Sequence, residues 1–183
     1  RYAAADTLER ESMHLRVERS RLHERLKQDY HEQAGRRIQA IRTFQRYSAS
    51  LYENAGSLEI ADSDNGPQFE VTIPGEKSKG IQSMQIFCFD LMLMELCAER
   101  GMGPGFLIHD SHLFDGVDER QVAKALALGA ESASRLNYQY LVTMNSDALP
   151  KEGYPRGFDL ADHRLPVVLT DATETGGLFG QRF

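Results

Sequence analysis

Cysteine is scarce in this sequence, which has only Cys88 and Cys97 among its 183 residues. The two are nine positions apart in one apolar run, so a helix would place them on roughly opposite sides. A disulfide between them is therefore not expected. We interpret both as reduced packing residues of a cytosolic protein, and nothing around them follows the ligand spacing of a zinc site.

Long apolar runs are also missing. The most apolar stretches, residues 86–97 and 141–144, are too short or too polar to cross a bilayer. No signal-peptide pattern opens the chain. We therefore expect a soluble, cytoplasmic protein with no membrane partner. The chain begins at Arg1 rather than at Met, which suggests a fragment of a longer protein.

A third absence concerns phosphate binding. No stretch of the chain follows the pattern G-x-x-x-x-G-K-[ST], whose backbone N–H groups cradle the phosphates of a nucleotide. The chain by itself is therefore expected neither to bind ATP tightly nor to hydrolyse it.

Proline is absent from residues 3–51, and Gly35 is the only glycine there. Leu8, Leu15 and Leu22 repeat every seven residues, and apolar residues at spacings of three or four continue to Leu51. This pattern predicts one helix of about 48 residues, roughly 70 Å long, with an apolar stripe for a partner helix. We interpret residues 1–51 as a coiled-coil arm and residues 52–183 as a separate domain.

The charge of the chain is unevenly distributed. Residues 1–50 contain 11 Lys and Arg against 7 Asp and Glu, whereas the rest is acidic and the net charge is -6. A basic arm can contact nucleic-acid phosphates, so DNA is a candidate partner. The alternative is a solvated coiled-coil surface.

The second part of the chain predicts an α/β fold. Residues 57–60 and 68–73 alternate polar and apolar around a turn-rich segment, which indicates a β-hairpin. Residues 80–100 are predicted to form a core helix. Two strands follow, at 106–108 and 138–144, and the helix between them, which Asp118 caps, makes them a parallel pair. Adding a strand at 166–170 and a sheet edge at 177–183 gives a mostly parallel sheet with flanking helices.

Polar residues that can carry chemistry follow the strands and open the core helix. Asp110 and Asn145 come directly after two parallel strands, where open α/β sheets bind ligands. A carboxylate at such a position can hold a nucleotide-bound Mg²⁺. Ser78, Lys79 and Gly80 open the core helix, where free N–H groups stabilise an anion.

In this order, the features resemble the C-terminal half of the ABC-type ATPase heads of SMC and RecN-like coiled-coil proteins, which have a P-loop NTPase-like fold. Residues 86–91 and 109–120 are similar to the family known as domain of unknown function 2326. The parts carrying the resemblance are the incoming helix, the hairpin, a signature-like helix at Ser78-Lys79-Gly80, a Walker B-like strand ending at Asp110, a D-loop-like segment at 116–120 and Asn145 after the next strand.

The resemblance implies a composite ATP site shared with an N-terminal P-loop lobe and with a second head in a homodimer. Asp110 would hold Mg²⁺, and Ser78 and Gly80 would reach the γ-phosphate of ATP on the second head. Asp118 would communicate across the dimer, and Asn145 would sense the γ-phosphate. DNA repair or defence against foreign DNA is the process that the resemblance implies.

Three residues depart from the pattern of such ATPases. Ser111 replaces the glutamate that orients the attacking water, Lys79 replaces a glycine, and Asn145 replaces a histidine. His112 or Asp115 is the candidate substitute base, because either group can accept a proton near neutral pH.

Two other functions stay open. One is a metal-dependent hydrolase built on His109, Asp110, His112 and Asp115, although neighbouring strand residues point to opposite faces. The other is a non-catalytic interaction module that uses the helical arm to dock on a partner or on DNA.

Overall fold

The computed structural model describes residues 2–63, 65–73, 78–170 and 172–180. It divides the chain into two compact units, residues 1–153 and 154–183. The elements of the first unit are α1 (Tyr2–Glu32), α2 (Ala34–Leu51), β1 (Ser57–Ala61), β2 (Gln68–Thr72), α3 (Lys79–Ala98), β3 (Phe106–His109), the 3-10 helix η1 (Ser111–Phe114), α4 (Glu119–Leu136) and β4 (Gln139–Val142). The second unit contains two 3-10 helices, η2 (Leu160–His163) and η3 (Leu178–Gly180). The predicted boundary at residues 51/52 stays a prediction.

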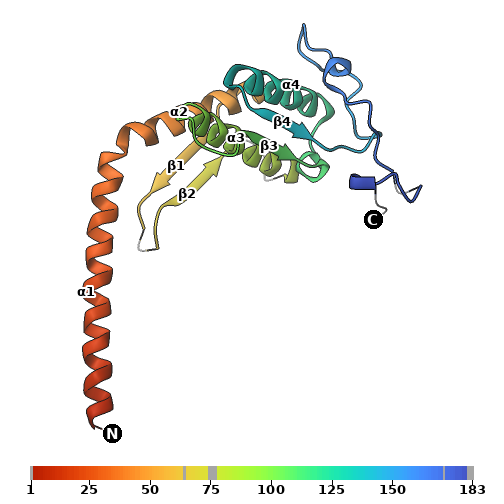
Figure 1. The fold of residues 1–183 in the computed structure, drawn as a ribbon. Coiled ribbons are helices and arrows are strands. Elements are labelled where there is room, and N and C mark those ends of the chain that lie inside the picture. Colours follow the sequence, from red (N-terminus) through yellow and green to blue (C-terminus); the bar gives the residue numbers. More distant parts are fainter. Residues whose placement is uncertain (1, 64, 74–77, 171, 181–183) are drawn as a thin grey trace. The chain divides into compact units, whose positions relative to one another are not determined.

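The prediction of one continuous helix over residues 3–51 is wrong, because α1 and α2 are separate helices that meet at Gln33 (φ -88°, ψ 8°). Gly35 lies beside the break, and glycine is among the weakest helix formers. The two helices also have different surroundings (Figure 1). Leu8, Leu15 and Leu22 on α1 are 63–71% exposed, whereas Phe44, Tyr47 and Leu51 on α2 are buried.

Three helices form the core of the first unit. Helices α2, α3 and α4 pack against one another (Figure 1). The largest fully buried side chains come from α2 and α3 and include Phe44, Tyr47, Met84, Phe87 and Leu91. The predicted core helix is therefore present. By length and apolar composition, α3 is the one helix of the described residues that could span a membrane, and its place in this core fits a soluble protein.

The predicted hairpin is confirmed. Strands β1 and β2 pair antiparallel, with Leu58 opposite Val71 and Ile60 opposite Phe69. Gly56 positions the hairpin on α2: its N–H donates to Ser48 Oγ at 2.7 Å, and a Cβ at Gly56 would clash with Ile73 and Phe44. The hairpin also contacts α3, because the rings of Phe69 and Phe89 meet edge to face at 5.9 Å.

The prediction of a mostly parallel sheet is wrong. Within the described residues, the parallel sheet has two strands, β3 and β4, with Phe106 opposite Gln139 and His109 opposite Val142. The expected strand at 166–170 has no strand partner there, and the Thr170 N–H donates instead to the Gly176 carbonyl at 2.9 Å. The predicted edge at 177–183 forms a 3-10 turn over Leu178–Gly180, and residues 181–183 lie outside the described residues. Strand propensity shows which segments are able to pair but supplies no neighbour for them.

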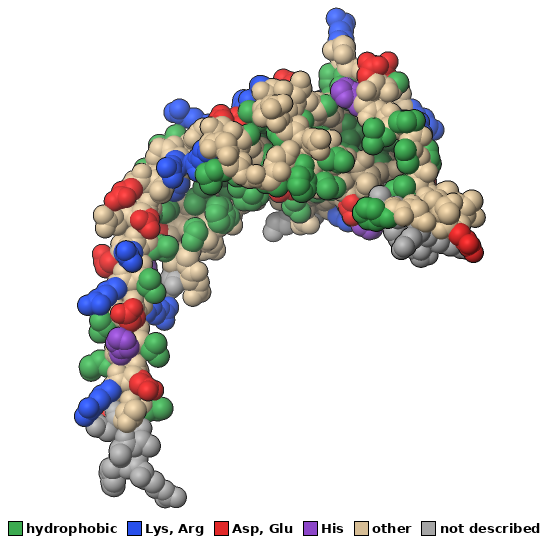
Figure 2. All heavy atoms as spheres, in the orientation of Figure 1, with side chains coloured by type: hydrophobic (Ala, Val, Ile, Leu, Met, Phe, Trp, Pro, Cys, Tyr) green, Lys and Arg blue, Asp and Glu red, His purple; other side chains and the backbone are tan. Residues whose placement is uncertain are grey.

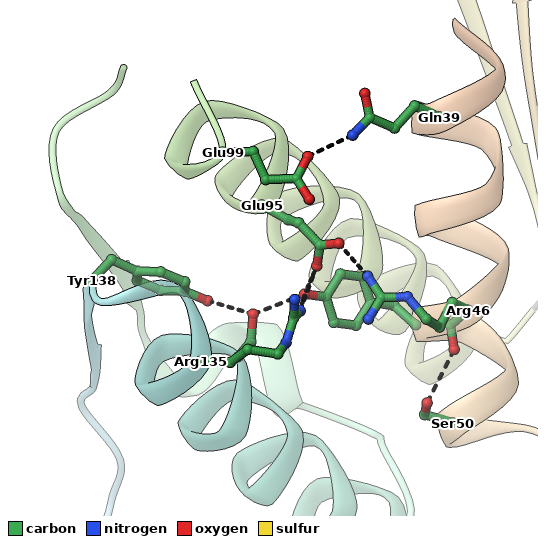
Figure 3. A network of polar contacts seen from close by, with 9 residues as sticks. Gln39, Arg46, Ser50, Glu95, Glu99, Arg135 and Tyr138 are labelled. Carbon is green, nitrogen blue, oxygen red and sulfur yellow. Dashed lines mark hydrogen bonds and ion pairs between the residues drawn. The ribbon is translucent and has the colours of Figure 1, made fainter. Parts of the chain in front are cut away.

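A buried polar network joins the three core helices (Figure 3). Its centre is Glu95 of α3, whose side chain is 6% exposed. Its carboxylate accepts hydrogen bonds from Arg46 of α2, from Tyr47 of α2 at 2.6 Å and from Arg135 of α4 at 2.6 Å. The Tyr47 hydroxyl also meets Ser132 Oγ at 2.8 Å. A buried carboxylate with three donors holds the helices in one relative arrangement.

Because of this network, the free energy of unfolding depends on pH. Burial opposes ionisation of Glu95, but the hydrogen bonds from Tyr47, Arg46 and Arg135 outweigh it and lower the pKa of the carboxyl below its usual 4.5. A lowered folded-state pKa stabilises the fold above the unfolded-state pKa, and this contribution is lost as pH falls through the folded-state value. We therefore expect the urea concentration at the unfolding midpoint to decrease as the pH is lowered below 4.5.

The Glu95→Gln variant provides the comparison for this pH dependence, because its amide does not ionise. We expect the variant to be less stable than the parent at pH 7 and to lose less of its stability between pH 7 and pH 3. Urea unfolding followed by circular dichroism at several pH values measures both effects. Equal acid sensitivity of the two proteins would assign the loss to other carboxyls.

Candidate functional site

The candidate site starts at the carboxyl ends of β3 and β4. Their inward face carries His109 and Tyr140, which contact α3 and α4. Helix α4 approaches β4 so closely that a Cβ at Gly129 would clash with the Tyr140 ring. The outward face carries Phe106, Ile108 and Leu141, which are all exposed. Within the described part of the chain, the parallel pair is thus packed on one face and exposed on the other.

Asp110 lies at the tip of β3, as the sequence predicts. Its carboxylate is exposed, and Oδ1 accepts the His112 N–H at 3.0 Å, so Asp110 caps η1. Asn145 follows β4. The Thr143 N–H donates to the His109 carbonyl at 3.1 Å and extends the strand pairing by one residue, and Asn145 lies beyond this point. The Asn145 side chain is exposed, and its carbonyl accepts the Ala148 N–H at 3.0 Å.

The start of α3 is in direct contact with the segment after η1. Ser78 caps α3 by accepting the Ile81 N–H at 3.3 Å. Gly80 is buried against the backbone of the turn at Gly116, where an added Cβ would lie 3.0 Å from the Gly116 carbonyl carbon and closer still to its oxygen. The structure therefore brings together two predicted site segments, residues 78–80 and 115–118, that are far apart in the sequence.

An exposed charge cluster connects the same two segments. Lys79 Nζ lies 3.5 Å from Asp115 Oδ2, and His112 Nδ1 lies 3.2 Å from the same oxygen. The hydrogen bond with His112 and the nearby Lys79 ammonium lower the pKa of the Asp115 carboxyl. A carboxylate with a lowered pKa is a weaker base, so of the two predicted bases His112 is the better suited to accept a proton.

Asp118 and Ser111 lie at the edge of this cluster. Asp118 caps α4, and its Oδ1 accepts from both the backbone N–H and the Nε–H of Arg120, each at 3.1 Å. These hydrogen bonds lower the Asp118 carboxyl pKa. Ser111 opens η1 directly after Asp110 and is half-buried.

His109 faces away from this cluster, although it precedes Asp110 in the chain. Its Nε2 lies 3.1 Å from Asp90 Oδ2 on α3, and its Nδ1 lies 3.0 Å from the Tyr140 hydroxyl on β4. This pairing fits the tautomer that carries its proton on Nε2. The interaction of Asp90, His109 and Tyr140 was not predicted; the signal that could have indicated it is the acidic Asp90 within an apolar stretch of the core helix.

A metal ion would find few ligands in this region. Within the described part of the chain, no group of three or more His, Cys, Asp or Glu side chains converges. The four residues of the alternative hydrolase do not form one site, because His109 points into the core while His112 and Asp115 are exposed. Asp110 by itself suits Mg²⁺, which commonly uses one or two carboxylates together with water and nucleotide phosphates.

Fold and site together define a small mixed α/β domain in which one strand of a parallel pair is followed by an exposed carboxylate, and the turn at Gly116 contacts the start of the buried helix α3. Residues 47–183 match the family described as "Uncharacterised protein conserved in bacteria (DUF2326)". The match covers most of the chain, so the protein belongs to the DUF2326 family. No curated protein matches the sequence.

Proposed function

We propose that this chain is the C-terminal lobe of an SMC/RecN-like ABC-type ATPase head. The lobe contributes the signature-like start of α3, the Walker B-like Asp110 and the D-loop-like segment at 116–120 to a composite ATP site. The observation that carries the proposal is the contact of Gly80 with Gly116, which joins the first and third of these parts; Asp110 lies six residues before Gly116 in the chain.

The bare face of the β3–β4 pair supports a missing partner lobe. Parallel strands are normally covered on both faces, because their side chains are apolar on both. Phe106, Ile108 and Leu141 stay exposed in the chain by itself. We propose that the P-loop lobe of the same protein packs near these residues and supplies the phosphate-binding loop that the sequence lacks.

The proposed roles of the single residues are those that the resemblance to such ATPases implies. Asp110 holds Mg²⁺ with one carboxylate, while Ser78, Lys79 and Gly80 face the γ-phosphate of ATP bound to a second head. Asp118 communicates across the dimer of heads, and Asn145 senses the phosphate. Since Ser111 carries no carboxylate, His112 is the first candidate for the base and Asp115 is the second. Repair of DNA or defence against foreign DNA in the cytoplasm is the proposed setting.

The deciding experiment compares two aspartates with the same local role. Asp110 caps η1 by accepting the His112 N–H at 3.0 Å, and Asp159 caps η2 by accepting the Ala161 N–H at 2.9 Å. Asparagine preserves such a cap. In the complete protein that contains this chain, we expect Asp110→Asn to reduce Mg²⁺-dependent ATP turnover at least about tenfold, because a Mg²⁺ ligand is lost.

The matched variant Asp159→Asn should leave turnover unchanged. Equal turnover in the parent and in Asp110→Asn would contradict the role of Asp110. A complete protein that binds no ATP would contradict the ATPase proposal as a whole. That outcome would favour the alternative, a helical interaction module, for which the exposed leucines of α1 provide a surface (Figure 2).

A further inference from the structure

We propose that the junction between α1 and α2 is a hinge, and that Tyr30, Arg37 and the β1 carbonyl of Ile60 form a latch that fixes the direction of α1. This inference does not depend on the ATPase proposal. It rests on contacts at the junction and on the local sequence Gln33-Ala34-Gly35.

The helical conformation is interrupted at the junction, but backbone hydrogen bonds remain on both sides of it. Gln33 lies between the two helices with φ -88° and ψ 8°, outside the usual helical range. The Gln33 N–H still donates to Asp29 O at 2.9 Å, and the Arg37 N–H donates to Gln33 O at 3.0 Å. Each of these hydrogen bonds extends one of the two helices as far as Gln33, so the helices are joined through this one residue.

Gly35 favours movement at this point for a reason unrelated to packing. A Cβ at Gly35 would meet no atom within 4 Å, and no positive φ requires glycine there. Glycine leaves more backbone freedom than any other residue, so it weakens the helix beside the break. Packing does not require glycine at this position, and a flexible junction benefits from it.

The latch consists of two contacts around one ring. The Tyr30 hydroxyl of α1 donates to the Ile60 carbonyl of β1 at 2.5 Å. The Arg37 guanidinium of α2 lies over the Tyr30 ring, 3.3 Å from its centre, which is a cation–π contact. Tyr30 thus ties the end of α1 both to the next helix and to the hairpin that lies beside it (Figure 1).

The three leucines of the repeat on α1 contribute no apolar packing to its placement. Leu8, Leu15 and Leu22 are exposed, so apolar burial does not hold the N-terminal turns of α1 against the core. The hairpin, in contrast, is anchored to α2 through Gly56 and to α3 through Phe69. Because the hairpin is anchored and α1 is held mainly at its C-terminal end, the contacts of Tyr30 determine the direction of α1.

Distance measurements between spin labels test the latch in the full chain. Labels are placed at two exposed positions through Ser20→Cys on α1 and Ser134→Cys on α4, in a Cys97→Ser background. The remaining Cys88 is buried, and burial raises its pKa to about 12, so it stays unlabelled. We expect one dominant distance in this parent.

Two variants should release the latch. Tyr30→Phe keeps the ring but removes the O–H donor, and we expect the population outside the dominant distance to rise about fivefold. Arg37→Gln removes the cation–π contact and should raise that population about threefold. Tyr52→Phe is the matched control, because the buried Tyr52 hydroxyl has no hydrogen-bond partner among the described residues. It should leave the distribution unchanged.

The Gly35→Ala substitution tests the hinge separately. Added to Tyr30→Phe, it should narrow the distribution again, because alanine stiffens the helix next to Gln33. A distribution that is unchanged in both latch variants, or already broad in the parent, would overturn the latch. A distribution that stays broad in the double variant Tyr30→Phe/Gly35→Ala would overturn the placement of the hinge. Thermal unfolding confirms that each variant is folded.

Discussion

Replacing Glu95 with alanine should destabilise the first unit by about 3 kcal/mol, because it removes the acceptor shared by Arg46, Tyr47 and Arg135. Loss of one partner from a buried charge network costs about 3–5 kcal/mol. The lower end applies, since the Arg46 and Arg135 side chains are 49% and 41% exposed and can turn toward water. The Tyr47 hydroxyl is buried and, within the described residues, would keep hydrogen bonds with Ser132 and Arg135.

Urea unfolding at pH 7 measures this loss. The matched control is Glu99→Ala, one turn further along the chain, where the Glu99 carboxylate accepts an exposed hydrogen bond from Gln39 at 2.5 Å. That variant should change the free energy of unfolding by less than about 0.5 kcal/mol, as surface substitutions usually do. Similar effects of the two substitutions would mean that the network does not join the helices as described. A substitution Tyr47→Phe, which removes one donor, should have an intermediate effect.

Alanine at Gly80 should destabilise the protein by about 2 kcal/mol, although alanine is the better helix former. Its Cβ would lie 3.1 Å from Val117 Cα and 3.0 Å from the Gly116 carbonyl carbon, and still closer to the Gly116 oxygen. All three are backbone atoms, so no side chain can rotate away to relieve the clash. The start of α3 and the turn at 116–117 must then move apart.

The matched variant for this effect is Gly35→Ala, another helical glycine, but one with open space around it. It should stabilise the protein by about 0.5 to 1 kcal/mol, because alanine reduces the backbone freedom of the unfolded chain. The two glycine-to-alanine changes are thus expected to have opposite signs in the same urea assay. A stabilising Gly80→Ala would show that the contact between the two site segments is loose.

Local patterns in the sequence predicted the elements well. Alternation of apolar residues gave the hairpin, and the apolar run after Ser78 gave the core helix, because both depend on short-range periodicity. Position after a strand also placed Asp110 correctly at the end of β3, whereas Asn145 lies three residues beyond the end of β4. These features need no knowledge of distant contacts.

The prediction was wrong where distant contacts decide. The sheet has two parallel strands in the described residues because the segment at 166–170 finds no strand to pair with there. The helical arm is divided at Gln33. Gly35 weakens the helix after this residue, and Tyr30 before it donates a hydrogen bond to the hairpin. His109 and Glu95 became part of polar networks whose other members come from different elements.

The sequence by itself determined the two strands of the hairpin and the core helix, that Asp110 follows a strand, and that the motif G-x-x-x-x-G-K-[ST] does not occur, since each of these depends on neighbouring residues. The tertiary structure decided the rest. It placed Gly80 on Gly116, turned His109 toward Asp90 and surrounded Glu95 with three donors. Such contacts depend on which elements pack against one another. Periodicity along the chain shows which face of an element is apolar, but not which other element covers it.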